Sequence, residues 1–448
     1  METPETSKVL KLQEIAERTL PAGVAGAGRF NPSLGHSLFL ERADGARLYD
    51  VDGKEYIDYN LSHGACLLGH NHPAVKQAIQ AALDRGLTSG YETAETARLA
   101  QRIVDIIPCA EKVRLANSGS EGTELTLRLA RGFTGKAKIV KFWGHFHGMY
   151  DYVMYNAHSP LWPVPPGTRV PLMREGSGIP EQLDALLIVL PWNDEQALEA
   201  VVREDGHDIA GIIMEPINYN QGCIVATKSY MESVRKLASD NNIVLIYDEV
   251  LSAFRTGVGC AQEYYGVVPD LCVIAKAVSN GVPLAVVTGK DEIMQQVTPA
   301  GHVAHSGTYS GNLLSVMAAN ATLAEITAEG FYDHIYAVAD ALYVGLSEVL
   351  ARAGIPARVQ GLGARFGIYF GFTHEVTHFS DTFEHDGKMA ARFLRACANR
   401  GVYFHSYGSL VTGHHGISAA HTLADVGETL NRIESAAREM APGASGEG

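Results

Sequence analysis

Lys276, Asp248 and the segment 117–123 are the parts of this sequence whose residue types and positions could do chemistry. Lys276 and Asp248 each follow an apolar run of strand length. A lysine at the end of a buried strand is costly unless its amine is neutralised, paired or used covalently. Wound sheets bind their ligands at the carboxyl ends of strands, so an aspartate at that place is well positioned for catalysis.

The segment 117–123 reads Asn-Ser-Gly-Ser-Glu-Gly-Thr and lies between a short apolar run and a helical pattern over 125–132. Small residues at such a turn let several backbone N–H groups point at one group of oxygens, and the helix dipole adds positive charge. Each of the three features also has a structural explanation: a capped helix start, a capping aspartate, or a lysine that reaches solvent. In this order, however, they suit pyridoxal 5′-phosphate (PLP), which needs a lysine amine, a carboxylate for its pyridine nitrogen and an anion site for its phosphate.

The elements that must position these residues are indicated by hydrophobic periodicity. Short β-branched runs separated by helix-length segments predict buried, mostly parallel strands of an α/β sheet over 139–142, 185–190, 209–214, 243–247, 271–275 and 284–288. Alternation near the start predicts a small antiparallel meander with strands over 37–40, 47–49 and 56–59 and a turn at Asp52-Gly53. Helices are predicted over 5–18 and 313–327, and Thr422 with Asp425 predicts the capped start of a last helix.

Composition limits the class of protein. The 448 residues are 46% hydrophobic, and 36 Lys and Arg against 50 Asp and Glu give a net charge of −14. No apolar run approaches the roughly 20 residues of a membrane span, and an acidic chain without a basic block argues against a nucleic-acid partner. Six scattered cysteines and no secretory leader lead us to expect a cytoplasmic protein. The pairs His145/His147 and His414/His415 lack partners at ligand spacing, so no metal site is predicted.

Nine motifs in order resemble one family. They are 49–53 (YDVDG), 69–73 (GHNHP), 117–121 (NSGSE), 128–135 (RLARGFTG), 146–148 (FHG), 215–216 (EP), 248–250 (DEV), 275–276 (AK) and 307–312 (GTYSGN). From about Pro21 to the last helix the sequence resembles the class III, fold type I aminotransferases that use PLP, in the branch typified by glutamate-1-semialdehyde 2,1-aminomutase. The resemblance implies a large domain with a mostly parallel wound sheet over 71–311 and a smaller α+β domain formed by the two chain ends, 1–70 and 312–448. It also implies a homodimer with active sites at the interface.

The resemblance also implies roles for individual residues. Lys276 corresponds to the lysine that forms a Schiff base with the cofactor and then moves a proton, and Asp248 to the partner of the pyridine nitrogen. The other cofactor contacts that it implies are Gly119 and Ser120 at the phosphate, Phe146 and Val250 on the two ring faces, His147 in the 146–148 motif, Glu215 near the phenolic side, and Thr308 at the phosphate of the neighbouring subunit.

The substrate pocket is less well specified by the sequence. Arg29 falls where the mutase branch has an arginine that can pair with a substrate carboxylate. Further candidates for substrate contacts, any of which could instead be packing residues, are His63, Trp143, Tyr150, Tyr219, Asn220 and Tyr407.

The expected reaction is transfer of an amino group between an amine or amino acid donor and a carbonyl acceptor in a ping-pong Schiff-base mechanism. A strict glutamate-1-semialdehyde mutase is disfavoured because 277–282 reads Ala-Val-Ser-Asn-Gly-Val, no serine stands near Gly26, and 150–180 is rich in proline and bulky residues. An aminomutase or a PLP-dependent racemase or epimerase remains an alternative. An oxidoreductase is disfavoured because no GxGxxG follows a first strand, and a non-catalytic scaffold because Lys276 and Asp248 are both present.

Overall fold

The computed structural model describes residues 7–159, 164–407 and 412–440. Its largest sheet has seven strands in the order β6-β14-β13-β12-β9-β7-β8. All neighbouring strands are parallel except at β14, which runs antiparallel to β13 and to β6. The strands are β6 (Lys112–Ala116), β7 (Lys138–Phe142), β8 (Leu187–Leu190), β9 (Ile209–Met214), β12 (Val244–Glu249), β13 (Leu271–Ile274) and β14 (Ala285–Gly289). The mostly parallel sheet predicted from the sequence is confirmed.

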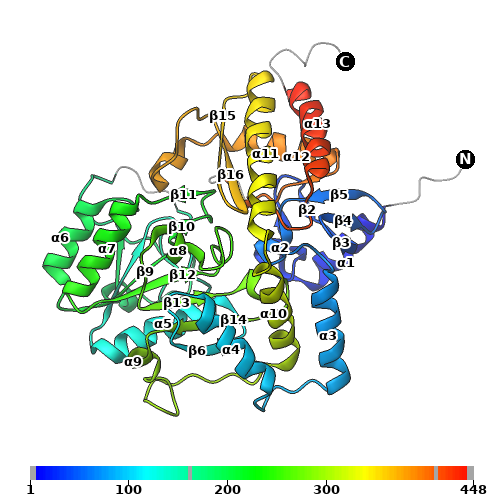
Figure 1. Ribbon diagram of the computed structural model, residues 1–448. Helices are drawn as coiled ribbons and strands as arrows, with labels where there is room; N and C mark the ends of the chain where they lie inside the picture. The colour runs from blue at the N-terminus through cyan, green and yellow to red at the C-terminus, as the bar shows by residue number, and fades with distance from the viewer. Residues whose placement is uncertain (1–6, 160–163, 408–411, 441–448) are drawn as a thin grey trace, which may run out of the picture.

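Helices cover this sheet, which explains why its strands are apolar on both faces (Figure 1). Helix α5 packs closely on the sheet at Gly122, where a Cβ would lie 2.7 Å from the Val273 side chain. Ser118 caps α5 by accepting a hydrogen bond from the Glu121 N–H. The helices around the sheet are α3 (Pro73–Arg85), α4 (Ala94–Ile106), α5 (Gly119–Thr134), α6 (Glu195–Asp205), α7 (Lys228–Asp240), α8 (Cys260–Tyr265), α9 (Asp291–Met294) and α10 (Leu313–Ile326).

The two ends of the chain share a second sheet of four strands, β17-β5-β4-β3. Strand β17 (Val402–Tyr403) pairs in parallel with β5 (Glu55–Asp58), which forms an antiparallel meander with β4 (Arg47–Asp50) and β3 (Leu40–Asp44). Figure 1 shows these N-terminal strands beside the C-terminal helix α13. Arg47 binds Asp425 of that helix at 2.8 Å. The α+β unit built from both chain ends is therefore present, whereas the domain limits 1–70, 71–311 and 312–448 stay a prediction.

Smaller elements complete the chain. A three-stranded sheet has the order β15-β16-β18, and β1 pairs with β2 and β10 with β11. These strands are β1 (Phe30–Asn31), β2 (His36–Ser37), β10 (Ile217–Asn218), β11 (Ile224–Val225), β15 (Ala357–Leu362), β16 (Arg365–Phe370) and β18 (His415–Gly416). The remaining helices are α1 (Lys8–Thr19), α2 (Leu61–Gly64), α11 (Phe331–Arg352), α12 (Gly387–Asn399) and α13 (Leu423–Met440).

Two strand predictions need correction. The strand predicted over 37–40 is wrong, because β2 ends at Ser37 and the next strand begins only at Leu40 and continues to Asp44. Gly45, with φ +54°, then turns the chain into β4. The strand predicted over 185–190 begins at Leu187, since a 3₁₀ turn occupies Glu181–Leu186.

The predicted helices are present, with small differences at their ends. The predicted N-terminal helix is α1, although residues 5 and 6 lie outside the described residues. The predicted cap of α13 is confirmed. The Thr422 N–H donates to Asp425 Oδ2 at 2.9 Å, and the Asp425 N–H donates to Thr422 Oγ1 at 3.1 Å.

Helix α11 is the one described helix that is long and apolar enough to cross a membrane by length and composition. One face of it, however, is buried within the chain, at Ile335, Val338, Leu342 and Leu346. It packs against β15 and α13. The apolar character of α11 is therefore explained by its place in the core.

Candidate active site

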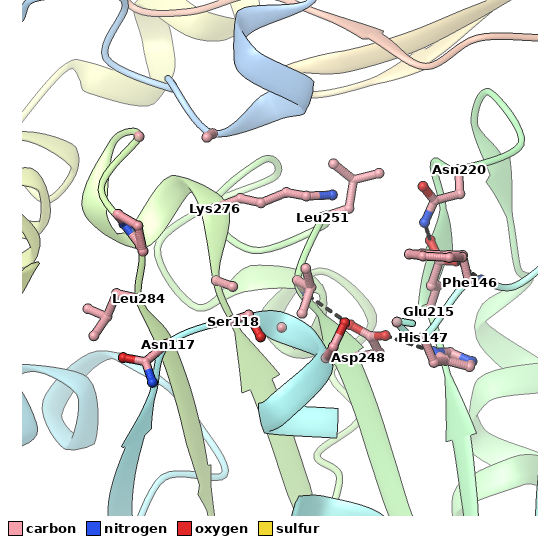
Figure 2. A pocket seen from close by; sticks show the side chains of 18 of the residues that line it. Asn117, Ser118, Phe146, His147, Glu215, Asn220, Asp248, Leu251, Lys276 and Leu284 are labelled. Atoms are coloured by element: carbon pink, nitrogen blue, oxygen red, sulfur yellow. Dashed lines mark hydrogen bonds and ion pairs between the residues drawn. The ribbon is translucent and has the colours of Figure 1, made fainter. Parts of the chain in front are cut away.

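A cavity of about 330 Å³ lies at the carboxyl ends of three neighbouring parallel strands. Glu215 follows β9 directly, Asp248 is the penultimate residue of β12, and Lys276 comes two residues after the end of β13. The N-terminus of α5 closes one side of the cavity, and Ala65, just after α2, closes another. Figure 2 shows the Lys276 side chain extending across the cavity above Asp248. Of the predicted site residues, nine line it: Gly119, Ser120, Phe146, His147, Glu215, Asn220, Asp248, Val250 and Lys276.

Lys276 has an amine that no other described residue engages in a hydrogen bond or ion pair. Burial lowers its pKa to about 8, and the positive charge of Arg365 acts in the same direction. Its backbone has φ +48°, a conformation that non-glycine residues adopt at a cost. The protein therefore holds a lysine whose amine is partly neutral near physiological pH and free to act as a nucleophile.

Asp248 is fixed by two hydrogen bonds. His147 Nδ1 lies 2.7 Å from Asp248 Oδ2, and the Val250 N–H donates to Oδ1 at 3.0 Å. Burial lowers the pKa of His147, against the effect of the neighbouring carboxylate. The other ring nitrogen of His147 is buried and has no hydrogen-bond partner among the residues that the structure describes. The pair thus holds a carboxylate in a fixed orientation at the bottom of the cavity.

Glu215 is the second buried acid of the cavity. It accepts hydrogen bonds from the Phe146 N–H at 2.8 Å and from Asn220 Nδ2 at 2.9 Å. Burial raises its pKa to about 8, and the negative charge of Asp248 adds to this. At neutral pH Glu215 is therefore mostly protonated. The bond to Phe146 also fixes the backbone that carries the aromatic ring into the cavity (Figure 2).

The opposite side of the cavity is a glycine-lined helix start. A Cβ on Gly119 would lie 2.7 Å from the Val250 side chain, and one on Gly148, whose φ is +117°, would lie 2.6 Å from Ser120 Oγ. The Met149 N–H donates to Ser120 Oγ at 3.1 Å. Only glycines allow the loop and the helix to approach this closely. The N–H groups and dipole of α5 favour an anion here.

These residues fit PLP. The cavity combines an unpaired amine, a fixed buried carboxylate, a planar aromatic side chain and an anion-binding helix start. Each of the four matches one part of that cofactor: its aldehyde, pyridine nitrogen, ring and phosphate.

The remaining predicted residues lie elsewhere. Arg29 and Thr308 are exposed in the single chain. His63 lies on α2 and contacts Tyr407 rather than lining the cavity. Tyr150 does not line the cavity either, and packs against an apolar cluster that includes Leu127 and Val153. Trp143 packs against Phe379 and Phe383, and the Tyr219 hydroxyl donates to Leu362 O at 2.7 Å.

Comparison with known proteins decides the family, because residues 31–421 match the one described as Aminotransferase class-III. The chain belongs to this family. Glutamate-1-semialdehyde 2,1-aminomutase 1 of Staphylococcus epidermidis (strain ATCC 35984) is 36% identical over 430 residues, which are 96% of this chain and 98% of that protein. This class III enzyme is also similar in structure to an omega-transaminase from Sphaerobacter thermophilus, with a TM-score of 0.90, 26% identity, and 97% and 98% of the two chains covered.

A further solved relative is the PLP internal aldimine form of the FumI protein of Sphingopyxis sp. MTA144. Its TM-score is 0.83 at 25% identity, and the match covers 96% of this class III enzyme and 97% of that chain. The predicted fold type I architecture and PLP as cofactor are thereby confirmed, as is the resemblance to the aminomutase branch.

Sequence reasoning missed three side chains next to the cavity: Asp58, Arg255 and Arg365. Both arginines are buried, and their charges lower the pKa of Lys276. No motif marks Arg365, which is the first residue of an otherwise apolar strand, β16. Only the fold, which brings β16 next to α2, reveals that it lies near Lys276.

Proposed function

We propose that this enzyme is an aminotransferase that moves an amino group from an amine or amino acid donor to a carbonyl acceptor in two half-reactions. The observation that carries the proposal is the free amine of Lys276 facing the fixed carboxylate of Asp248 across the cavity (Figure 2). When bound, PLP supplies an aldehyde that takes up amines and a ring that accepts electrons from the adjacent carbon.

The chain's own residues would divide the remaining work. Lys276 would hold the cofactor and, once displaced by substrate, carry a proton to and from the reacting carbon. Asp248, oriented by His147, would favour a protonated ring nitrogen. Gly119 and Ser120 would bind the phosphate, Phe146 and Val250 would lie on the two ring faces, and Glu215 would stand near the phenolic oxygen as a hydrogen-bond partner that Asn220 holds in place.

A dimer would complete the site. Thr308 is exposed in the single chain, next to Tyr309, which is 67% exposed. Leu87 and Tyr309 line a surface depression beside the cavity, together with Asn117 at the start of the α5 turn. Exposed apolar side chains of this size are typical of interfaces. We propose that a second copy covers this surface in a homodimer, so that Thr308 would reach the phosphate of the neighbouring subunit. We also propose a cytoplasmic, biosynthetic enzyme.

A second candidate is an aminomutase, because the curated relatives at 36% identity carry that name. Its donor and acceptor would be one molecule, and the same Lys276 would move the proton. A racemase or epimerase would use the same residues and return the proton to the other face of the carbon. Arg29, His63, Tyr150 and Asn220 stay the proposed substrate contacts.

The first test is an absorption spectrum of the purified protein with PLP, before and after a panel of amines. We expect a band at about 410–430 nm that disappears with a suitable amine. Lys276→Ala should lack this response, whereas Lys290→Ala, which removes an exposed lysine, should keep it. No band after incubation with PLP would refute the proposal.

Isotope transfer separates the candidates. An aminotransferase passes ¹⁵N from a labelled donor to a different carbonyl compound that is then recovered as the amine. If the label appears only in an isomer of the donor, the enzyme is an aminomutase. If the donor merely loses its optical purity, it is a racemase or epimerase.

A further inference from the structure

A left-handed turn directly precedes Ala65, which lines the cavity. Leu61, Ser62 and His63 have φ values of 54°, 54° and 57°, and Gly64 has 86°. Non-glycine residues adopt this conformation at a cost, and they normally do so singly. The turn is held from below by Asp58, which accepts hydrogen bonds from the Asn60 N–H at 2.8 Å and the Leu61 N–H at 3.0 Å. A strained segment fixed by dedicated partners points to a functional role.

Two buried arginines hold the other end of this turn. Arg255 donates to the Gly64 carbonyl, and Arg365 Nη1 lies where a Cβ on Gly64 would be only 2.5 Å away. Neither arginine has a carboxylate partner in the described part of the chain. Arg365 donates to His414 O at 3.0 Å and to His414 Nδ1, while its Nε and Nη1 have no hydrogen bond. A buried positive charge without a counter-ion is expensive unless an anion is bound nearby.

Asp58 is bound by other groups. Besides the two backbone N–H groups of the turn, it binds His70 Nε2 at 2.8 Å. Burial lowers the pKa of His70, but the hydrogen bond with Asp58 outweighs this effect and raises that pKa to about 10, so His70 is a cation paired with Asp58. The charge of Asp58 also favours the charged form of Arg365, but Arg365 has no carboxylate in ion-pair contact among the described residues.

His63 is the side chain that this turn presents. Its Nδ1 lies 2.6 Å from the Tyr407 hydroxyl, and the Tyr407 ring stacks on His414 with centroids 4.9 Å apart. Burial lowers the pKa of His63 to about 3, and the charges of His405 and Lys276 act in the same direction. His63 is thus neutral and has one N–H. If the Tyr407 hydroxyl donates to Nδ1, that proton is on Nε2, which has no partner among the described residues.

We infer that His63 and Arg365 select substrates that carry a carboxylate: His63 Nε2 donates a hydrogen bond to it, and Arg365, behind Tyr407 and His414, supplies the balancing positive charge. This inference rests on the proposed function and adds the substrate class, amino acids and oxo acids instead of simple amines. His63 is the contact residue, whereas Tyr407 and Arg365 are positioning residues. Arg29, which is exposed, is not needed for this contact.

The test compares binding of a carboxylate and its neutral counterpart to the PLP-loaded enzyme by calorimetry, using 3-phenylpropionate and 3-phenylpropionamide. Because hydrogen bonds to charged groups are strong, we expect His63→Phe and Arg365→Met to weaken 3-phenylpropionate binding by roughly 10- to 100-fold. Binding of the amide should change little. Tyr407→Phe should have a smaller effect of the same kind, and His207→Phe, at an exposed histidine away from the turn, none.

Several outcomes would overturn the inference. They are equal losses for both ligands, no loss in His63→Phe, or a loss of carboxylate binding in Arg29→Met alone. Arg365→Lys keeps the charge and should restore part of the affinity, and His63→Phe decides the question if Arg365→Met does not fold. Binding needs no turnover, so an enzyme that selects the carboxylate but transfers no amino group would refute the proposed function and leave the carboxylate site intact.

Discussion

Replacing Glu215 by glutamine should make the stability of the cofactor-free protein less sensitive to pH. The folded chain raises the pKa of Glu215 from 4.5 to about 8, chiefly through burial. Between these two values the unfolded chain releases the Glu215 proton, while the folded chain keeps it. The free energy of unfolding therefore falls as pH rises from 4.5 to 8, in total by on the order of 4 to 5 kcal/mol.

Glutamine removes this proton but keeps the shape of the side chain. Its carbonyl oxygen can accept the hydrogen bond from the Phe146 N–H, and the Asn220 amide can turn its oxygen toward the new NH₂ group. The free energy difference between Glu215→Gln and the wild type should therefore shift in favour of the variant by about 1.4 kcal/mol for each pH unit between 5 and 8. Other ionisable groups contribute equally to both proteins and cancel in the difference.

The measurement is urea unfolding of both cofactor-free proteins at pH values from 5.5 to 8. Glu199→Gln, at an exposed position of α6, is the matched control and should give a difference that does not depend on pH. If the difference for Glu215→Gln is equally flat, Glu215 is ionised throughout this pH range. That result would refute the assignment of Glu215 as a protonated acid at neutral pH.

Three further predictions concern the cavity and the sheet shared by the chain ends. Gly148→Ala should weaken PLP binding and lower Tm, because the new Cβ would lie 2.6 Å from Ser120 Oγ and the backbone φ of Gly148 is positive. Cofactor retention after dialysis measures the loss of PLP binding. Gly176→Ala, where a Cβ meets no atom, is the control and should behave as wild type. Asp248→Asn should still bind PLP but lose kcat by about 100-fold or more in single-turnover assays, and a smaller loss would show that its charge matters little. Arg47→Met should cost about 1 to 3 kcal/mol, because Arg47 binds three carboxylates within 2.8 Å; urea unfolding at low salt tests this, and the cost should shrink in high salt.

The bottom of the active site could be predicted from the sequence because each of its parts is local. A strand-length apolar run ending in Asp248 or followed by Lys276 fixes both the element and the end at which the side chain emerges. The turn 117–123 likewise contains its own cap and its own glycines. Once the parallel sheet is predicted, these three segments must meet at one edge, and they do.

The turn over residues 61–64 could not be predicted in this way, because its conformation depends on residues far apart in sequence. Nothing in Leu61-Ser62-His63 announces positive φ values; these follow from Asp58, Arg255 and Arg365, which bind or crowd the turn from three other elements. Arg365 sits in a strand whose other residues are apolar, so periodicity gives no sign that its guanidinium is buried with no carboxylate beside it in the described part of the chain. For the same reason the sequence could not show that Arg29 is exposed or that Tyr150 packs in an apolar cluster and does not line the cavity.

Charged and protonated groups on both sides of Lys276 bear on the protonation of its amine. Below it, burial keeps Glu215 protonated at neutral pH. Above it, Arg365 has no carboxylate partner among the described residues, and its charge lowers the pKa of Lys276. The positive charge of Arg365 favours the free-base form of the Lys276 amine, which is the form that attacks. The same buried charge is unfavourable until an anion binds beside it. A substrate carboxylate would neutralise the charge of Arg365 when the substrate displaces Lys276. This would raise the basicity of the released Lys276 amine just as it becomes the proton carrier.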